Sequence, residues 1–129
     1  MLDTSVLIDL ERVDSALLPA AVSISALTMA ELAAGPHSTD DRTERARRQD
    51  RLQRAESTFD PLPFDAHAAR AYGRLYAAAP AAGRNARGRR AIDLLIAATA
   101  MAHDLPLYTR DPDDFAGLDG LRVVPVATT

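Results

Sequence analysis

The sequence predicts an α/β domain with a short, mainly parallel central sheet and helices on its faces. Short apolar runs of strand length alternate with longer stretches of helical periodicity, and this alternation is typical of a parallel sheet covered by helices. The chain has 129 residues, of which 47% are hydrophobic and 26% are charged. That length suits one core and is short for two, so we expect residues 1–129 to form a single domain.

The first third of the chain alternates twice between an apolar run and a helix. Leu2 ends a strand stub, and residues 4–11 are expected to form a helix whose start is capped by a polar side chain. Residues 21–25, AVSIS, have the composition of a buried strand. The helix that follows carries residues 29–33 and is expected to end at Gly35 and the proline after it.

The middle of the chain is more polar. Residues 39–57 are highly charged and lack proline, which predicts an amphipathic helix that faces solvent on most of its circumference. Two prolines keep residues 59–64 extended. Asp65 is expected to cap a helix that runs to about residue 79.

The last third returns to apolar runs. A loop rich in glycine and arginine, residues 82–90, leads to a strongly apolar helix expected at about residues 90–103. Strands are expected at residues 106–108 and 121–126, with a turn of helix at residues 113–116.

Composition excludes several classes of function. The chain has no cysteine, which excludes disulfides, thiol catalysis and cysteine-ligated zinc. Its basic residues are all arginines, so mechanisms that need a lysine are excluded. The net charge of −3 argues against a nucleic-acid partner unless bound cations offset the acidic excess. No apolar run approaches the roughly 20 residues that span a bilayer, and a signal peptide is not evident, so we expect a cytoplasmic protein without a membrane partner.

Four acidic residues lie in apolar or small-residue surroundings: Asp3, Glu31, Asp93 and Asp111. Carboxylates are almost never buried unless they are paired, hydrogen-bonded or bound to metal. Two of the four directly follow expected strands, and ligands of open α/β sheets bind at the carboxyl ends of strands. Because hard oxygen ligands select Mg²⁺ or Mn²⁺, we predict one shared divalent-cation site used for phosphoryl chemistry.

Each acid also has a structural explanation. Asp3 precedes Thr-Ser and could simply cap a helix, and Glu31 could be a partly exposed helix acid. Asp111 precedes a proline and could be a turn residue. Asp93, between Ile92 and Leu94, is hardest to explain in this way.

The chain resembles the PIN-domain ribonucleases, and among them the VapC-type toxins of bacterial toxin–antitoxin pairs. The matching segments are LDTSVLIDL, SISALTMAELAAG, DLLIAATAMAHDLPLYTRD and DDFAGLDGLRVV. They span nearly the whole chain in the family's order, although only two residues precede the first acid, where family members have several. The resemblance implies a three-layer α/β/α domain and an endoribonuclease that depends on Mg²⁺ or Mn²⁺.

The resemblance also assigns site residues. Asp3, Glu31 and Asp93 match the family's first three acids. Asp111 falls where the family has Asp or Asn in its Thr-x-Asp/Asn motif, and Asp114 matches the acid before phenylalanine in the terminal motif. Which of these two is the fourth acid stays open. Hydrogen bonds that support the site are expected from Thr4, Ser5 and Thr109.

Partners follow from the same resemblance. The substrate would be RNA, hydrolysed to leave a 5′-phosphate and a 3′-hydroxyl, and a VapB-type antitoxin would neutralise the toxin. The antitoxin's tail is expected in a groove near Leu10, Leu32 and the helix at residues 42–54, and the toxin is expected to be a homodimer. Contacts to RNA phosphates are expected from the arginine loop, that is from Arg84, Arg87, Arg89 and Arg90.

Two alternatives belong to other functional classes. A catalytically inactive PIN-like module would bind RNA or a partner without cleaving it. A haloacid-type phosphatase would use Asp3 as its nucleophile, but that chemistry needs a second aspartate two residues later and a lysine. Position 5 is a serine, and the sequence has no lysine.

Overall fold

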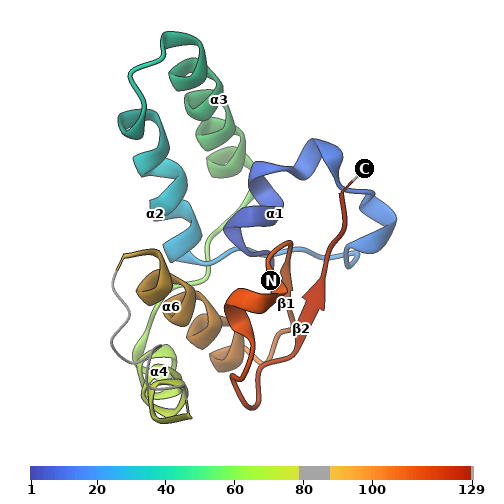
Figure 1. The fold of residues 1–129 in the computed structure, drawn as a ribbon, viewed down its shortest axis with the longest axis vertical. Helices are drawn as coiled ribbons and strands as arrows, with labels where there is room; N and C mark the ends of the chain where they lie inside the picture. Colours follow the sequence, from blue (N-terminus) through green and yellow to red (C-terminus); the bar gives the residue numbers. More distant parts are fainter. Residues whose placement is uncertain (79–87, 129) are drawn as a thin grey trace.

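The computed structural model describes residues 1–78 and 88–128. At its centre lies a small parallel sheet formed by β1 (Leu107–Thr109) and β2 (Val123–Pro125) (Figure 1). Three further extended segments continue this parallel arrangement through isolated contacts. Leu2 bridges Tyr108, its N–H donates to Ser23, and Ser25 bridges Leu62. The predicted short parallel sheet is therefore present, but only two of its segments are long enough to count as strands.

The strands are shorter than the sequence suggested. The run at residues 21–25 forms an extended segment with a single bridge, at Ser25, and the strand expected at residues 121–126 is reduced to β2. Proline limits pairing at one edge: Leu62 lies between two prolines and exchanges hydrogen bonds only with Ile24 and Ala26, at 2.9 and 2.8 Å. A proline has no N–H to donate, and the residues on either side of Leu62 face away from the 24–26 segment, so no further strand can pair on the outer side of Leu62.

Five α-helices of the described residues surround the sheet, and their bounds agree with the predicted ones to within a few residues except for the first. That helix was expected to reach residue 11, but it ends at Ile8 and is followed by a separate 3₁₀ turn at Leu10–Arg12. Figure 1 shows α2 beside α3 and α4 beside α6. The helices are α1 (Thr4–Ile8), α2 (Ala26–Ala34), α3 (Arg42–Thr58), α4 (Ala66–Ala78) and α6 (Arg89–Ala102).

Among the described residues, the core consists of two hydrophobic clusters on opposite faces of the sheet. One contains Met1 and Leu107 and packs against α4 and α6, whereas the other contains Leu2 and, at its margin, Tyr108. Successive residues of an extended chain point to opposite faces. The second cluster is completed by α1, α2 and Ala55 of α3. Helices thus cover both faces, and the three-layer α/β/α architecture is confirmed.

Polar side chains cap three of the helices in the way that helix-start chemistry predicts. Ser25 accepts from the N–H of Thr28 at 3.0 Å at the start of α2, and Asp41 caps α3. Asp65 accepts from the N–H of Ala68 at 3.0 Å, which confirms its predicted role at the start of α4.

Candidate active site

Asp3 precedes α1, yet its side chain does not cap that helix. The residue is only 4% exposed, and its Oδ2 accepts hydrogen bonds from Ser5 Oγ at 2.8 Å and Thr109 Oγ1 at 2.9 Å. The Asp3 N–H donates to the carbonyl of Tyr108 at 2.8 Å, so this acid is fixed where the first segment meets β1. The explanation of Asp3 as a plain helix cap does not fit this geometry.

The two hydroxyls beside Asp3 are themselves oriented by backbone amides. The N–H of Arg110 donates to Ser5 Oγ at 3.1 Å, and the N–H of Asp111 donates to Thr109 Oγ1 at 3.0 Å. Because each hydroxyl accepts from an amide, its single proton is free to point at the carboxylate. The sequence predicted hydrogen bonds from both residues to the site, and both are present.

Glu31 is held by the third hydroxyl that the sequence predicted to support the site. Thr4 Oγ1 lies 2.6 Å from Glu31 Oε1 and 3.0 Å from Thr28 Oγ1, which in turn lies 3.3 Å from Ser25 Oγ. A hydroxyl has one proton, and a carboxylate is the stronger acceptor. Thr4 therefore donates to Glu31 in preference to Thr28, and Ser25 donates to Thr28.

The sequence reasoning missed two members of this chain of hydroxyls, Ser25 and Thr28. Both are fully buried. A usable signal was present: Thr28 stands three residues before Glu31 in α2, so it lies on the same face of the helix one turn earlier. Ser25 stands three residues earlier again.

Asp93 is buried on α6 among apolar neighbours, with 8% of its surface exposed. Its helix packs against α2 and against the 3₁₀ helix η4 (Pro112–Phe115). An acid at this depth is rare unless a polar partner or a ligand compensates it.

The two candidates for the fourth acid are less buried than Asp3 and Asp93. Asp111 is exposed and starts η4 without a side-chain cap, whereas Asp114 is half-buried and donates its N–H to the Asp111 carbonyl at 3.0 Å. The Asp111 backbone is tied to Asp3 through Thr109. That link places Asp111 next to the Asp3 environment but does not choose between the two acids.

The predicted shared site of four ligating carboxylates is not preformed. Within residues 1–78 and 88–128, no three His, Asp or Glu side chains form a group that could hold one metal ion. Asp3 and Glu31 are instead each held by their own hydroxyls. The donor set consists of carboxylate and hydroxyl oxygens, which suits Mg²⁺ or Mn²⁺ rather than a softer metal. Metal binding by these residues stays a prediction.

The arginine loop lies largely outside the part of the chain that can be described. Arg84 and Arg87 fall outside the described residues, and Arg89 is described only as the first residue of α6. Arg90 is exposed. The predicted contacts of these four residues with RNA stay a prediction.

Comparison with known proteins defines the class. The family model described as "PIN domain" matches residues 1–121, and the chain therefore belongs to the PIN-domain family. It is 39% identical to Ribonuclease VapC5 of Mycobacterium tuberculosis, over 98% of this chain and 92% of the relative.

Solved structures also match the fold of this chain. The VapBC-5 toxin–antitoxin structure from M. tuberculosis matches with a TM-score of 0.81 and 38% identity, covering 97% of this chain and 96% of the other. FitAcB from Neisseria gonorrhoeae matches with a TM-score of 0.70 and 28% identity, covering 95% and 94%. A DNA-bound VapBC from Salmonella typhimurium, at 24% identity and a TM-score of 0.73 over 97% and 96%, supports the fold alone.

Proposed function

We propose that this chain is the endoribonuclease toxin of a VapBC-type toxin–antitoxin pair. The observation that carries the proposal is its near full-length similarity to a VapC ribonuclease. The buried Asp3 supports it, because two oriented hydroxyls hold a carboxylate where helix-capping chemistry does not require one. The family and the missing lysine leave no support for the haloacid-type phosphatase.

The proposed site is the acid set itself, and Asp3, Glu31, Asp93 and Asp111 would hold Mg²⁺ or Mn²⁺. When bound, such a cation lowers the pKa of a water molecule and stabilises negative charge on a phosphate. Ser5 and Thr109 keep Asp3 in one orientation, and Thr4 does the same for Glu31. Asp111 or Asp114 would polarise the attacking water. Attack on phosphorus breaks the bond to the 3′ oxygen and leaves a 5′-phosphate and a 3′-hydroxyl.

The test is to map cleavage ends in cellular RNA after the chain is induced, with the Asp3→Ala variant as control. We expect discrete new 5′-phosphate ends with the native chain and none with the variant. The purified protein should cleave RNA with Mg²⁺ or Mn²⁺ and stop in EDTA. Cleavage that persists in EDTA would contradict the proposed metal dependence but not the nuclease activity. Identical cleavage ends from Asp3→Ala would contradict the assignment of Asp3 to the active site.

A second candidate is a PIN-like module that binds RNA or a partner without cleaving it. One observation favours it: no group of three acids close enough to ligate one ion exists within residues 1–78 and 88–128. RNA binding by the native chain with no cleavage in either Mg²⁺ or Mn²⁺ would select this candidate.

The antitoxin proposal is supported by a groove of about 730 Å³ between the α1 region and α3. Leu10 and Leu32 line it together with Arg47, Arg51 and Arg54, which agrees with the expected position of an antitoxin tail. Apolar walls with arginines suit an apolar segment that carries acidic residues. We expect coexpression with the protein encoded beside this chain to suppress its toxicity.

Homodimer formation and cytoplasmic location stay predictions. Tyr72 and Tyr76 pack against each other with ring centroids 6.1 Å apart, and Tyr76 is 42% exposed, so part of α4 offers an aromatic surface for a second copy. No helix within residues 1–78 and 88–128 combines the length and apolar character needed to cross a membrane.

A further inference from the structure

A second cavity, of about 440 Å³, adjoins Glu31. We name it the Glu31 pocket. Thr4 and Glu31 line it from α1 and α2, and Glu44, Arg48 and Arg51 line it from α3. The pocket therefore joins part of the candidate active site to the arginine-rich helix α3, which the sequence predicted to face solvent on most of its circumference.

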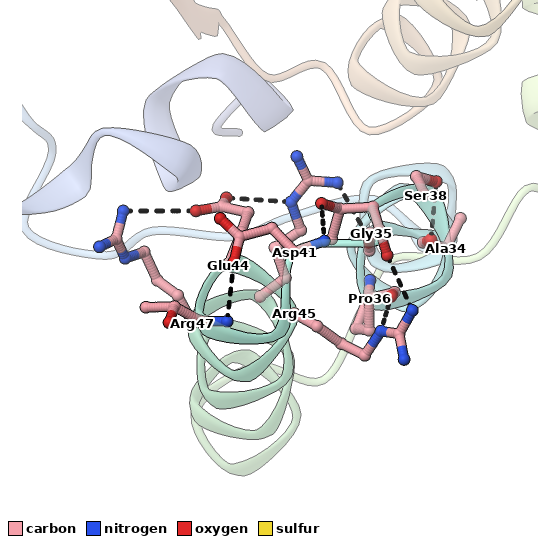
Figure 2. Close-up of polar contacts among 11 residues, drawn as sticks. Ala34, Gly35, Pro36, Ser38, Asp41, Glu44, Arg45 and Arg47 are labelled. Carbon is pink, nitrogen blue, oxygen red and sulfur yellow. Dashed lines mark hydrogen bonds and ion pairs between the residues drawn. The ribbon is translucent and has the colours of Figure 1, made fainter.

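Two of the charged residues that line the Glu31 pocket, Glu44 and Arg48, pair with each other. Arg48 Nε donates to Glu44 Oε1 at 3.0 Å, and Arg48 Nη1 donates to the carbonyl of Gly35 at 2.9 Å. Arg47 also pairs with Glu44, at 3.3 Å, and Figure 2 shows this carboxylate drawn between its partners. Glu44 and Arg48 thus form a fixed and nearly neutral part of the pocket wall.

Arg51 differs from the other arginines around it. Arg45, Arg47, Arg48 and Arg54 each bind a carbonyl or a carboxylate. Arg51 is half-buried, and among the described residues it has neither a hydrogen bond nor an ion pair. A half-buried guanidinium with five unused donors gains most from an anionic ligand.

We propose that Arg51 binds a backbone phosphate of the RNA substrate in the Glu31 pocket. The inference rests on the proposed nuclease function and names a residue that contacts the substrate in that same site. A guanidinium matches two phosphate oxygens at once. RNA that approaches Glu31 meets a carboxylate that repels its phosphates, and Arg51 lines the same pocket as Glu31, where its unpaired charge offsets that repulsion.

The test compares Arg51→Ala with Arg42→Ala. Arg42 lies on the same helix, is exposed, and lines neither the Glu31 pocket nor the groove, so it controls for the loss of one positive charge. All proteins carry Asp93→Asn to prevent cleavage, and binding of a labelled single-stranded RNA oligonucleotide of mixed sequence is measured by fluorescence anisotropy at several salt concentrations. Arg51→Gln and Arg51→Lys are included in case the alanine variant does not fold.

We expect Arg51→Ala and Arg51→Gln to weaken RNA binding about tenfold and to reduce the slope of log K against log salt by about 0.7. Arg51→Lys should restore the slope but only part of the affinity, because an ammonium lacks the two-pronged geometry. Arg42→Ala should change affinity less than about twofold. In the cleavage-competent chain, Arg51→Gln should raise KM more than it lowers kcat.

The outcomes separate this inference from the proposed function. If the native chain cleaves RNA but Arg51→Gln and Arg42→Ala bind it equally well, the Arg51 inference is overturned and the nuclease proposal stands. An Arg51 variant that loses antitoxin binding but keeps full RNA affinity also overturns it and assigns Arg51 to the antitoxin groove. If the native chain neither cleaves nor binds RNA, the proposed function itself fails.

Discussion

Helices α3 and α6 are similar in length but opposite in character. On α6, Asp93 and most of the residues from Leu94 to Ala100 are buried, whereas on α3 only Ala55 is buried. Each helix carries a residue proposed for the site, Asp93 on α6 and Arg51 on α3, and Arg51 lines the Glu31 pocket. An acid in an apolar helix is conspicuous, while one arginine among many on a polar helix is not.

The difference in burial between α6 and α3 determines how a residue on each helix can be recognised as functional. Asp93 stands out because a carboxylate is rarely buried on an apolar helix. Arg51 stands out only because its neighbours are paired and it is not, which is a property of the fold. A buried helix should therefore be sensitive to both charge and volume, and an exposed one only to the loss of a specific contact.

The largest expected effect is on activity, from Asp93→Asn on α6. The substitution keeps the shape of the side chain and removes its charge, so RNA cleavage should fall by at least about a hundredfold while the fold is kept. The matched control is Glu56→Gln, an exposed acid on α3, which should leave cleavage unchanged. Cleavage rates and thermal unfolding measure both. Equal rates for the two variants would remove Asp93 from the site.

The next largest effect is on stability. It is tested by replacing an alanine with leucine on each of the two helices. Ala97 on α6 is fully buried, and Ala46 on α3 is exposed. Ala97→Leu should destabilise the protein by about 2 kcal/mol through overpacking. Ala46→Leu should change stability by less than about 0.5 kcal/mol. Urea unfolding gives both values, and a similar cost for the two would mean that α6 is less tightly packed than its burial indicates.

Periodicity predicted the helices and a parallel sheet covered by helices, whereas the family resemblance implied the three-layer domain and the hydrogen bonds made by Thr4, Ser5 and Thr109. The sequence overestimated the strands: the run at residues 21–25 forms a single bridge, at Ser25, and the strand expected at residues 121–126 is reduced to β2. It also predicted one cation site shared by four acids, which stays a prediction. Convergence depends on side-chain orientations, and hydroxyl partners such as Thr4 determine those locally.

For a similar reason, the sequence could not show which buried serine and threonine hydroxyls belong to the site. Serine and threonine are common in helices and turns, and only the fold shows that Ser25, Thr28 and Thr4 form a chain that ends at Glu31. Likewise, nothing in the sequence distinguishes Arg51 from the arginines beside it.

Thr28→Val tests that chain of hydroxyls with a smaller expected effect. Valine keeps the shape but removes the hydroxyl that orients Thr4, so cleavage should fall about tenfold and stability by about 1 kcal/mol. Thr43→Val on α3 changes an exposed threonine in the same way and should lower neither cleavage nor stability. Loss of stability without loss of activity would limit Thr28 to a structural role.

The smallest effect is a pH dependence at the start of α4, the helix that packs against α6. The Ala68 N–H that donates to the Asp65 carboxylate, more than any other cause, holds the pKa of Asp65 below its ordinary value. Since the folded pKa is the lower one, the stabilising contribution is complete above the ordinary aspartate pKa of about 3.9 and is lost as the pH falls through the folded pKa. Asparagine also caps helices but does not ionise.

Asp65→Asn should therefore lower Tm slightly at neutral pH, and its difference from the native chain should shrink as the pH falls below about 4. Asp60→Asn removes the same charge from a nearby exposed residue and controls for the change in net charge. Thermal unfolding followed at a series of pH values measures the two differences. A difference for Asp65→Asn that stays constant down to the acid transition would mean that the carboxylate acts only as a neutral cap would. In that case the charge of Asp65 does not stabilise α4, and the stability lost at acid pH would come from the protonation of other carboxylates.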